Sequence, residues 1–182
     1  IVPFFVVLGL YLQNVCKLPP QTAGLVFMSV GIGFVLASSA GPILMRKYTP
    51  PHTLICGTLC TSVGIFAILL GAKTGVSATL PFVVLSLLLL GLGNGTVIPI
   101  ATGVVLRYLP KEIAGMGGAI LTTGQQLAGA VGTVLAGALL LTDGNPPVSA
   151  AAYVNGLAVQ VSAAFAALLC AALLSRIPAP TQ

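Results

Sequence analysis

The sequence predicts an all-α integral membrane protein with six transmembrane helices, and three observations lead to this fold class. First, 57% of the 182 residues are hydrophobic and only 5% are charged, whereas a soluble domain has about 25% charged residues. Second, the few charges divide the chain into long uncharged runs. Third, turn-forming residues separate these runs. So few charges argue against a soluble domain, a disordered segment or a nucleic-acid-binding module, and the lipid bilayer is the expected partner.

The uncharged runs predict membrane-spanning helices. A helix needs about 20 predominantly apolar residues to cross a hydrocarbon core of roughly 30 Å, and five of the runs reach that length. None shows the apolar/polar alternation of a barrel strand, and a helix satisfies its backbone hydrogen bonds internally. We therefore predict helices over residues 1–16, 23–45, 53–72, 80–106, 113–141 and 149–175.

Short connections containing turn residues separate the predicted helices. The first helix begins at Ile1-Val2-Pro3 and is too short for a full crossing, so we expect the chain to be the later part of a longer protein. The expected connections are Pro19-Pro20, Pro50-Pro51, Lys73-Thr74-Gly75, Pro110-Lys111-Glu112 and Asp143-Gly144-Asn145-Pro146-Pro147. Residues 1–182 would then form a single six-helix bundle, with a short cytoplasmic tail at 177–182.

Positively charged residues orient the predicted bundle. With six crossings, both termini and the second and fourth connections share one side of the membrane. The cations on that side are Arg46, Lys47, Arg107, Lys111 and Arg176, and those on the other side are Lys17 and Lys73. This excess predicts that both termini are cytoplasmic, because cytoplasmic loops are enriched in Lys and Arg.

Small residues recur at helix-packing spacing in the second, fourth and fifth predicted helices. Small side chains let helix backbones approach closely in lipid. The glycines that we expect in packing or hinge roles are Gly33, Gly41, Gly91, Gly93, Gly95, Gly124, Gly129 and Gly132. Their excess in the fourth and fifth helices fits helices that rock against their neighbours, and packing of a static bundle is the alternative.

Uncharged polar residues also lie at membrane depth. In the helix predicted at 80–106, Asn94 precedes Pro99, which removes one backbone hydrogen bond and should kink the helix. The other amides at depth are Gln13, Asn14, Gln125, Gln126, Asn155 and Gln160. Each either forms an interhelical hydrogen bond or lines a polar path, and the sequence leaves both alternatives open.

The sequence offers no residue set for catalysis or metal binding. Acid/base chemistry needs a pair of positioned titratable groups, but Glu112 and Asp143 fall in loops on opposite sides of the membrane. His52 is the single histidine and falls in a predicted loop, while Cys56 and Cys60 lack the second ligand pair of a structural zinc site. We therefore predict no enzyme, no metal and no cofactor.

Several short motifs follow one another along the chain. Those before residue 50 are Tyr11-Leu12-Gln13, Ala23-Gly24-Leu25 and Gly41-Pro42-Ile43-Leu44-Met45-Arg46. Those after it are Gly91-Leu92-Gly93-Asn94-Gly95 with Pro99, then Pro110, Ala114-Gly115, Gly117-Gly118 and Gln125-Gln126-Leu127-Ala128-Gly129-Ala130-Val131-Gly132. In this order, and over nearly the whole chain, they resemble the C-terminal six-helix half of a major facilitator superfamily transporter, in the branch of fourteen-helix drug:proton antiporters.

Two positions depart from the pattern of that family. The resemblance assigns a cytoplasmic gating loop consisting of Gly41, Arg46 and Lys47. In this loop Met45 replaces the acidic residue of the family motif and Tyr48 replaces its glycine, so a charge-relay gate lacks its acidic partner. Gln125 stands where many relatives have arginine, which leaves the fifth helix without a fixed charge.

The resemblance implies a secondary active transporter in which two six-helix halves tilt around a midplane site, by rocker-switch alternating access. Its first and fourth helices would line the cavity, its second and fifth would flank it, and its third and sixth would face lipid. The implied substrate-pathway residues are Tyr11, Gln13, Asn94, Pro99, Thr122, Gln125 and Gln126.

The implied partners are a missing N-terminal six-helix half, a small amphipathic organic compound or drug, and protons. Because no carboxylate or histidine lies at depth, we expect the coupling acid in the missing half. The implied activity is multidrug efflux by an antiporter of the bacterial inner membrane. The alternative is a non-transporting six-helix scaffold or a self-associating pore.

Overall fold

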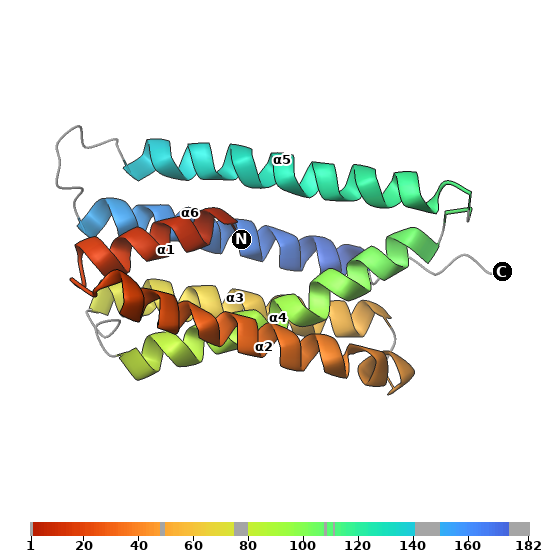
Figure 1. Ribbon diagram of the computed structural model, residues 1–182, viewed down its shortest axis with the longest axis horizontal. Helices are drawn as coiled ribbons and strands as arrows, with labels where there is room; N and C mark the ends of the chain where they lie inside the picture. The colour runs from red at the N-terminus through yellow and green to blue at the C-terminus, as the bar shows by residue number, and fades with distance from the viewer. Residues whose placement is uncertain are drawn as a thin grey trace.

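The computed structural model describes residues 2–47, 50–74, 80–107, 109–110, 112–140 and 150–174, and these ranges contain six α-helices (Figure 1). The helices are α1 (Val2–Asn14), α2 (Pro20–Lys47), α3 (Pro50–Thr74), α4 (Leu80–Arg107), α5 (Ala114–Leu140) and α6 (Ala150–Leu174). The all-helical fold class and all six predicted helices are confirmed, because long apolar runs leave the backbone no hydrogen-bond partner except itself.

Some residues predicted in turns belong to helices instead. Pro20 and Pro50 begin α2 and α3, since proline suits the first helical turn, where the backbone N–H would have no intrahelical partner. His52 was predicted in a loop and lies instead in the first turn of α3, where it is exposed. Lys73 was predicted in a turn and lies in the last turn of the same helix.

The predicted gating loop is partly helical. The backbone of Arg46 and Lys47 forms the end of α2, while the side chains of both residues fall outside the described part of the chain. The connection at 143–147 and the tail at 177–182 fall outside it entirely.

The turn after α1 caps that helix and returns the chain into α2. The N–H of Leu18 donates to the carbonyl of Leu12 at 3.0 Å, and the N–H of Val15 donates to the carbonyl of Tyr11 at 2.9 Å. Lys17 has a φ of 56°, in the left-handed region. These features match the helix-ending turn in which a left-handed residue follows the C-cap.

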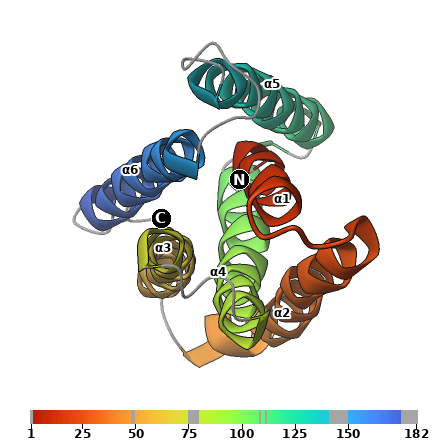
Figure 2. The ribbon, with the colours of Figure 1, turned by 90° about the vertical axis from the view of Figure 1, so that its left-hand side faces the viewer.

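The helices run side by side along the long axis of the molecule, and α4 has the most extensive contacts. Seen end-on in Figure 2, α4 lies between α2 and α3, while α1 lies beside α5 and α6. The buried core joins the two groups and includes Phe4, Leu8 and Leu12 of α1, Leu87 and Leu90 of α4, and Tyr153 and Leu157 of α6. By contrast, α5 is exposed along most of its length.

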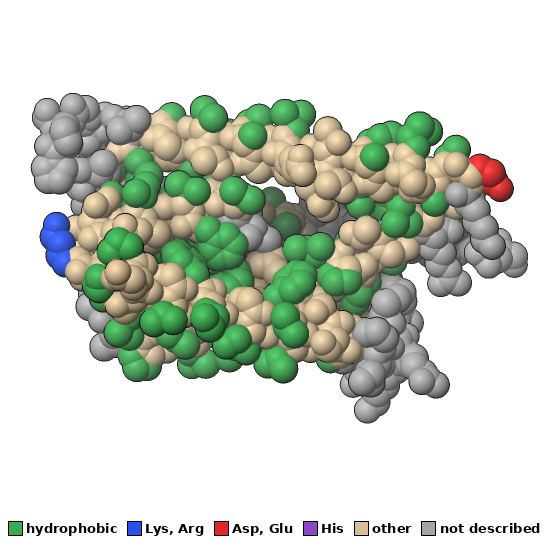
Figure 3. All heavy atoms as spheres, in the orientation of Figure 1, with side chains coloured by type: hydrophobic (Ala, Val, Ile, Leu, Met, Phe, Trp, Pro, Cys, Tyr) green, Lys and Arg blue, Asp and Glu red, His purple; other side chains and the backbone are tan. Residues whose placement is uncertain are grey.

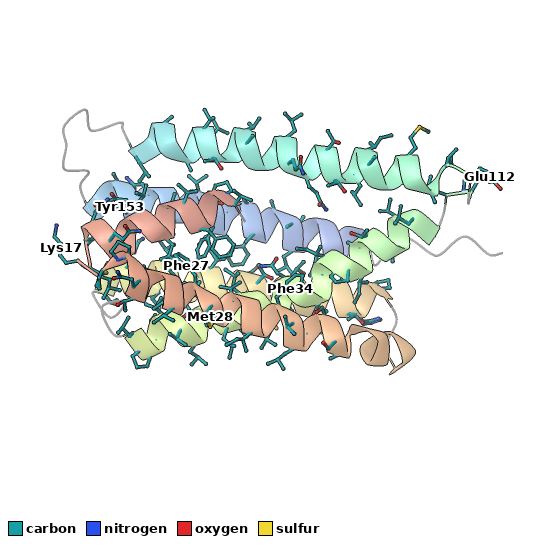
Figure 4. The ribbon with its side chains drawn as sticks, in the orientation of Figure 1. Lys17, Phe27, Met28, Phe34, Glu112 and Tyr153 are labelled. Atoms are coloured by element: carbon teal, nitrogen blue, oxygen red, sulfur yellow. The ribbon has the colours of Figure 1, made fainter. Side chains whose placement is uncertain are left out.

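Apolar side chains cover the outside of the bundle as well as its core. Figure 3 shows hydrophobic side chains spread along the whole face that it presents. Met28 is 57% exposed and points away from the bundle. Phe27, beside it, points inward, with its ring 5.7 Å from that of Phe5 (Figure 4). An apolar exterior of this kind is stable in lipid and unstable in water.

Within the described residues, four helices are long and apolar enough to cross a membrane. Their apolar segments are Pro20–Gly41, Pro51–Thr74, Leu80–Leu106 and Ala152–Leu169. The first helix is apolar but shorter. The fifth, which we predicted as a crossing, is not among the four, because Gln125, Gln126 and several glycines lower its hydropathy.

Candidate functional site

Glycines of α2 and α4 bring these two helices into backbone contact. A Cβ at Gly33 would lie 2.5 Å from the carbonyl oxygen of Leu88. On α4, a Cβ at Gly91 would lie 2.9 Å from the Cα of Val30, and one at Gly95 would lie 2.8 Å from the Cα of Phe34. Real Cβ atoms do not approach backbone this closely, so only glycine permits this packing.

The opposite side of α4 meets α3 in the same way. A Cβ at Gly57 would lie 2.7 Å from Cγ2 of Val97, and one at Gly93 would lie 2.5 Å from the carbonyl oxygen of Gly57. A Cβ at Gly64 would lie 2.8 Å from the carbonyl oxygen of Ser86. The fourth helix is thus clamped on two sides, and we call these three helices the α2–α3–α4 unit.

Of the other glycines singled out from the sequence, all but Gly132 have looser surroundings. At Gly41 and Gly124, an added Cβ would meet no described atom within 4 Å. At Gly129 it would lie 3.6 Å from Val2, an ordinary contact, and at Gly132 it would lie 2.8 Å from Cγ of Pro3. Close packing of α5 against α1 therefore depends mainly on Gly132.

Two hollows in the structure contain four of the amides predicted at membrane depth, and they separate residues that the resemblance grouped together. The inner cavity has a volume of about 220 Å³ and is lined by Phe4, Thr58, Thr61, Ser62, Ile65, Asn94, Val97, Gln160, Ala163, Ala164 and Ala167. The α5 groove has a volume of about 550 Å³ and is lined by Val2, Gln125, Gln126, Gly129, Ala130, Thr133 and Val134. Asn94 thus lies in one hollow, and Gln125 and Gln126 lie in the other.

The remaining predicted pathway residues line neither hollow. Tyr11 is only 4% exposed, and its ring packs edge-on against that of Tyr153, with centroids 6.0 Å apart. Gln13 and Pro99 are exposed, and α4 continues as one helix through Pro99. Thr122 is exposed, and its hydroxyl donates to the carbonyl of Gly118 at 2.9 Å.

Several residues of the inner cavity and of its surroundings were not singled out from the sequence. Thr58, Thr61 and Ser62 lie three and four residues apart on α3, a spacing that puts them on one helix face and could have been recognised. Tyr153 is fully buried and accepts a hydrogen bond of 2.9 Å from the Asn14 amide. That hydrogen bond links α1 to α6. It joins residues far apart in the sequence, so no local sequence pattern predicts it.

A bundle of long apolar helices with an apolar exterior is typical of an integral membrane protein. Residues 2–182 match the Major Facilitator Superfamily, and the chain belongs to that family. Its members are transporters, in agreement with the prediction that this chain is not an enzyme.

Curated relatives of the chain are resistance and export proteins. It is 31% identical to the puromycin resistance protein Pur8 of Streptomyces alboniger, over 94% of this chain and 36% of that protein. It is 34% identical to the lincomycin resistance protein LmrB of Listeria monocytogenes, over 72% of this chain and 27% of that protein. It is 29% identical to the tetracenomycin C resistance and export protein of Streptomyces glaucescens, over 71% of this chain and 24% of that protein. The chain thus spans between 24% and 36% of the length of these relatives.

Proposed function

We propose that the chain is the C-terminal six-helix half of a fourteen-helix drug:proton antiporter of the bacterial inner membrane. In this proposal, the complete transporter exports small amphipathic organic compounds by rocker-switch alternating access, and both termini of the chain are cytoplasmic. The observation that carries the proposal is the α5 groove, an amide-lined hollow on the least packed helix of a chain related to drug-resistance proteins.

The chemistry of the α5 groove suits amphipathic compounds. Gln125 and Gln126 are exposed and present neutral amides, each with donors and an acceptor. The hydroxyl of Thr133 donates to the carbonyl of Gly129 at 2.8 Å, which leaves its oxygen free to accept. Val2 and Val134 supply apolar walls. Phosphorylated substrates would need Arg or Lys here, and none of the residues that line this groove is charged.

The exposed apolar face of α5 supports a partner on this side of the bundle. Leu127, which follows Gln126 in the sequence, is 67% exposed, and Val134, which lines the groove, is 71% exposed. Relatives about three times as long as this chain have room for a second bundle. A second half packed here would close the groove into a path between the two halves.

Proton antiport needs an acidic group that this chain does not place within the membrane. The chain has only two acids, Glu112 and Asp143. Glu112 is exposed at one end of the bundle, in the connection before α5 (Figure 4). Because proton antiport requires a titratable group within the membrane, the proposal assigns the coupling acid to the part of the transporter outside this chain.

Drug accumulation in bacteria that lack their own efflux pumps tests this proposal. Cells producing the complete transporter should accumulate less ethidium and puromycin than control cells, and a protonophore should abolish the difference. The double variant Gln125→Leu/Gln126→Leu should change the relative resistance to the two compounds at an unchanged protein level. Asn155→Leu removes an exposed amide of α6 outside the groove and serves as the matched control.

Two results would contradict the proposal. Accumulation that is unaffected by the transporter would favour a non-transporting scaffold. Release of ethidium that persists with the protonophore and without a gradient would favour a self-associating pore.

A further inference from the structure

We propose that the inner cavity is a second binding site, separate from the α5 groove, for a small neutral molecule with one hydrogen-bond donor on an apolar body, such as a phenol. Residues of four helices line this partly open cavity: α1, α3, α4 and α6. The α5 groove is built from α1 and α5, and the two hollows share no lining residue. The inference therefore does not rest on the proposed transport activity.

Three hydroxyl residues of α3 line the cavity, and each hydroxyl donates to a backbone carbonyl. The hydroxyl of Thr58 donates to the carbonyl of Leu54 at 2.9 Å, and that of Thr61 donates to the carbonyl of Gly57 at 3.1 Å. The hydroxyl of Ser62 lies 3.4 Å from the carbonyl of Ala164 and donates across to α6. A hydroxyl has one proton and two lone pairs, so all three oxygens retain capacity to accept from a guest molecule.

The two amides extend this set of acceptors. Asn94 is 7% exposed, and its Nδ2 donates to the carbonyl of Leu90 at 3.1 Å, while its Oδ1 has no partner among the described residues. Gln160 makes no hydrogen bond to any residue that the structure describes. No described side-chain oxygen or nitrogen is both fully buried and unpaired, so the Asn94 oxygen, which belongs to a residue that lines the cavity, retains some accessible surface. A donor in the cavity would therefore find several acceptors.

Size and charge narrow the ligand class further. An engineered cavity of about 150 Å³ accommodates benzene, so about 220 Å³ has room for one ring with a small substituent. Phe4, Ile65 and Val97 supply the apolar wall against which a ring can pack. None of the residues that line this cavity is charged, and an ion there would be desolvated without a counter-charge. A neutral aromatic alcohol meets all of these conditions.

Fluorine NMR on the purified protein in detergent tests the inference with 4-fluorophenol and 4-fluoroanisole. The two probes have similar shapes, but only the phenol can donate. The 4-fluorophenol signal should broaden with the native protein far more than the 4-fluoroanisole signal does. Ala164→Phe fills the cavity and should abolish the difference, whereas Ala166→Phe, on the exposed side of the same helix, should preserve it. Partition into detergent is the same for every variant and cancels in the comparison.

A second set of variants keeps the shape of the cavity. Thr58→Val and Thr61→Val each remove an acceptor without changing volume. Because the phenol has a single O–H, the variant that removes the acceptor it uses should weaken 4-fluorophenol binding about fivefold, the value of one net hydrogen bond, and the other variant should weaken it less. Binding of 4-fluoroanisole should not change. Thr96→Val is the matched control, because the Thr96 hydroxyl donates to the carbonyl of Leu92 at 2.9 Å in the same way but does not line the cavity.

Three results would overturn the inference. Equal broadening of both probes would show that the hydrogen-bond acceptors of the cavity do not contribute to binding. Undiminished phenol binding by Ala164→Phe would locate the probe elsewhere. A lack of phenol broadening with the native protein would mean that the cavity holds water alone.

Discussion

Lys17 occupies a backbone conformation that costs energy for any residue with a Cβ. Among the described residues, it is the only non-glycine residue with a positive φ, at 56°. The position follows the end of α1, where glycine is the residue most often found. Its backbone forms the turn that brings α2 back alongside α1. The hydrogen bonds of this turn offset the conformational cost at Lys17.

We expect Lys17→Gly to stabilise the protein by about 1 kcal/mol, because glycine adopts this conformation without steric cost. The thermal unfolding midpoint in detergent should rise by about 2–4 °C. Lys17→Ala removes the charge and keeps the strain, so it should leave the midpoint near that of the native protein. An equal gain from both substitutions would attribute the effect to charge.

The polar residues show which parts of the site can be read from sequence. Asn94 and Pro99 are five residues apart, which is about 140° around a helix with 3.6 residues per turn. Asn94 is buried in the inner cavity, while Pro99 is exposed. Their closeness in sequence favoured one shared path, but helical geometry directs them to different surroundings. Which neighbouring helix each residue meets depends on tertiary packing, and no local pattern contains that information.

The helices themselves were predictable because their signal is local. The second helix was predicted at 23–45 and found at 20–47, since an uncharged run can satisfy its backbone only by folding into a helix. The starts of α2 and α3 moved upstream because Pro20 and Pro50 begin these helices rather than break them. The hydropathy of α5 shows a limit, since two glutamines in its middle reduce the signal of an otherwise apolar helix.

At the scale of the element, α4 depends on glycine on both of its packed faces. We expect Gly91→Ala and Gly95→Ala to destabilise the protein strongly, because even a methyl group would collide with the backbone of α2 at Val30 and Phe34. The unfolding midpoint and the yield of folded protein should both fall. Gly103→Ala is the matched control on the same helix, where an added Cβ would meet no described atom within 4 Å.

Tolerance of alanine at Gly91 and Gly95 would contradict this packing and would mean that α4 is free to move away from α2.

Side chains larger than alanine at these positions would overlap the α2 backbone even more. Gly95→Leu should therefore abolish transport by the complete protein, while insertion into the membrane, which depends on hydropathy, should persist.

At the scale of the whole molecule, the two ends of the bundle carry different charged residues. Lys17 and Glu112 lie at opposite ends of the long axis (Figures 3 and 4). With both termini cytoplasmic, Lys17→Cys should react with a membrane-impermeant maleimide added to intact cells. Glu112→Cys should react only after the cells are permeabilised. Both variants are made without the four native cysteines, and the reverse labelling pattern would invert the proposed orientation.

The incomplete surroundings of the α5 groove lead to a second prediction at this scale. Residues 1–182 expressed alone should insert into the membrane but should not transport, because the groove lacks a facing wall and the chain lacks an acid at depth. Transport by residues 1–182 alone can be measured as ethidium release from vesicles that contain only this chain. Release at the rate of the complete transporter would refute the prediction and would indicate self-association.

The fourth helix is tightly packed on two faces, whereas α5 is exposed along most of its length. The two helices should therefore differ in how many substitutions they tolerate. A side chain added at Gly91 or Gly95 would collide with the backbone of α2, and one added at Gly93 would collide with α3, so substitutions at these glycines disturb the fold. Along α5, by contrast, Gln125, Gln126 and Leu127 are exposed and can change at little cost to folding. If the α5 groove binds the substrate as proposed, selection by a new toxic compound would find tolerated variants in α5 before it found any at the glycines of α4.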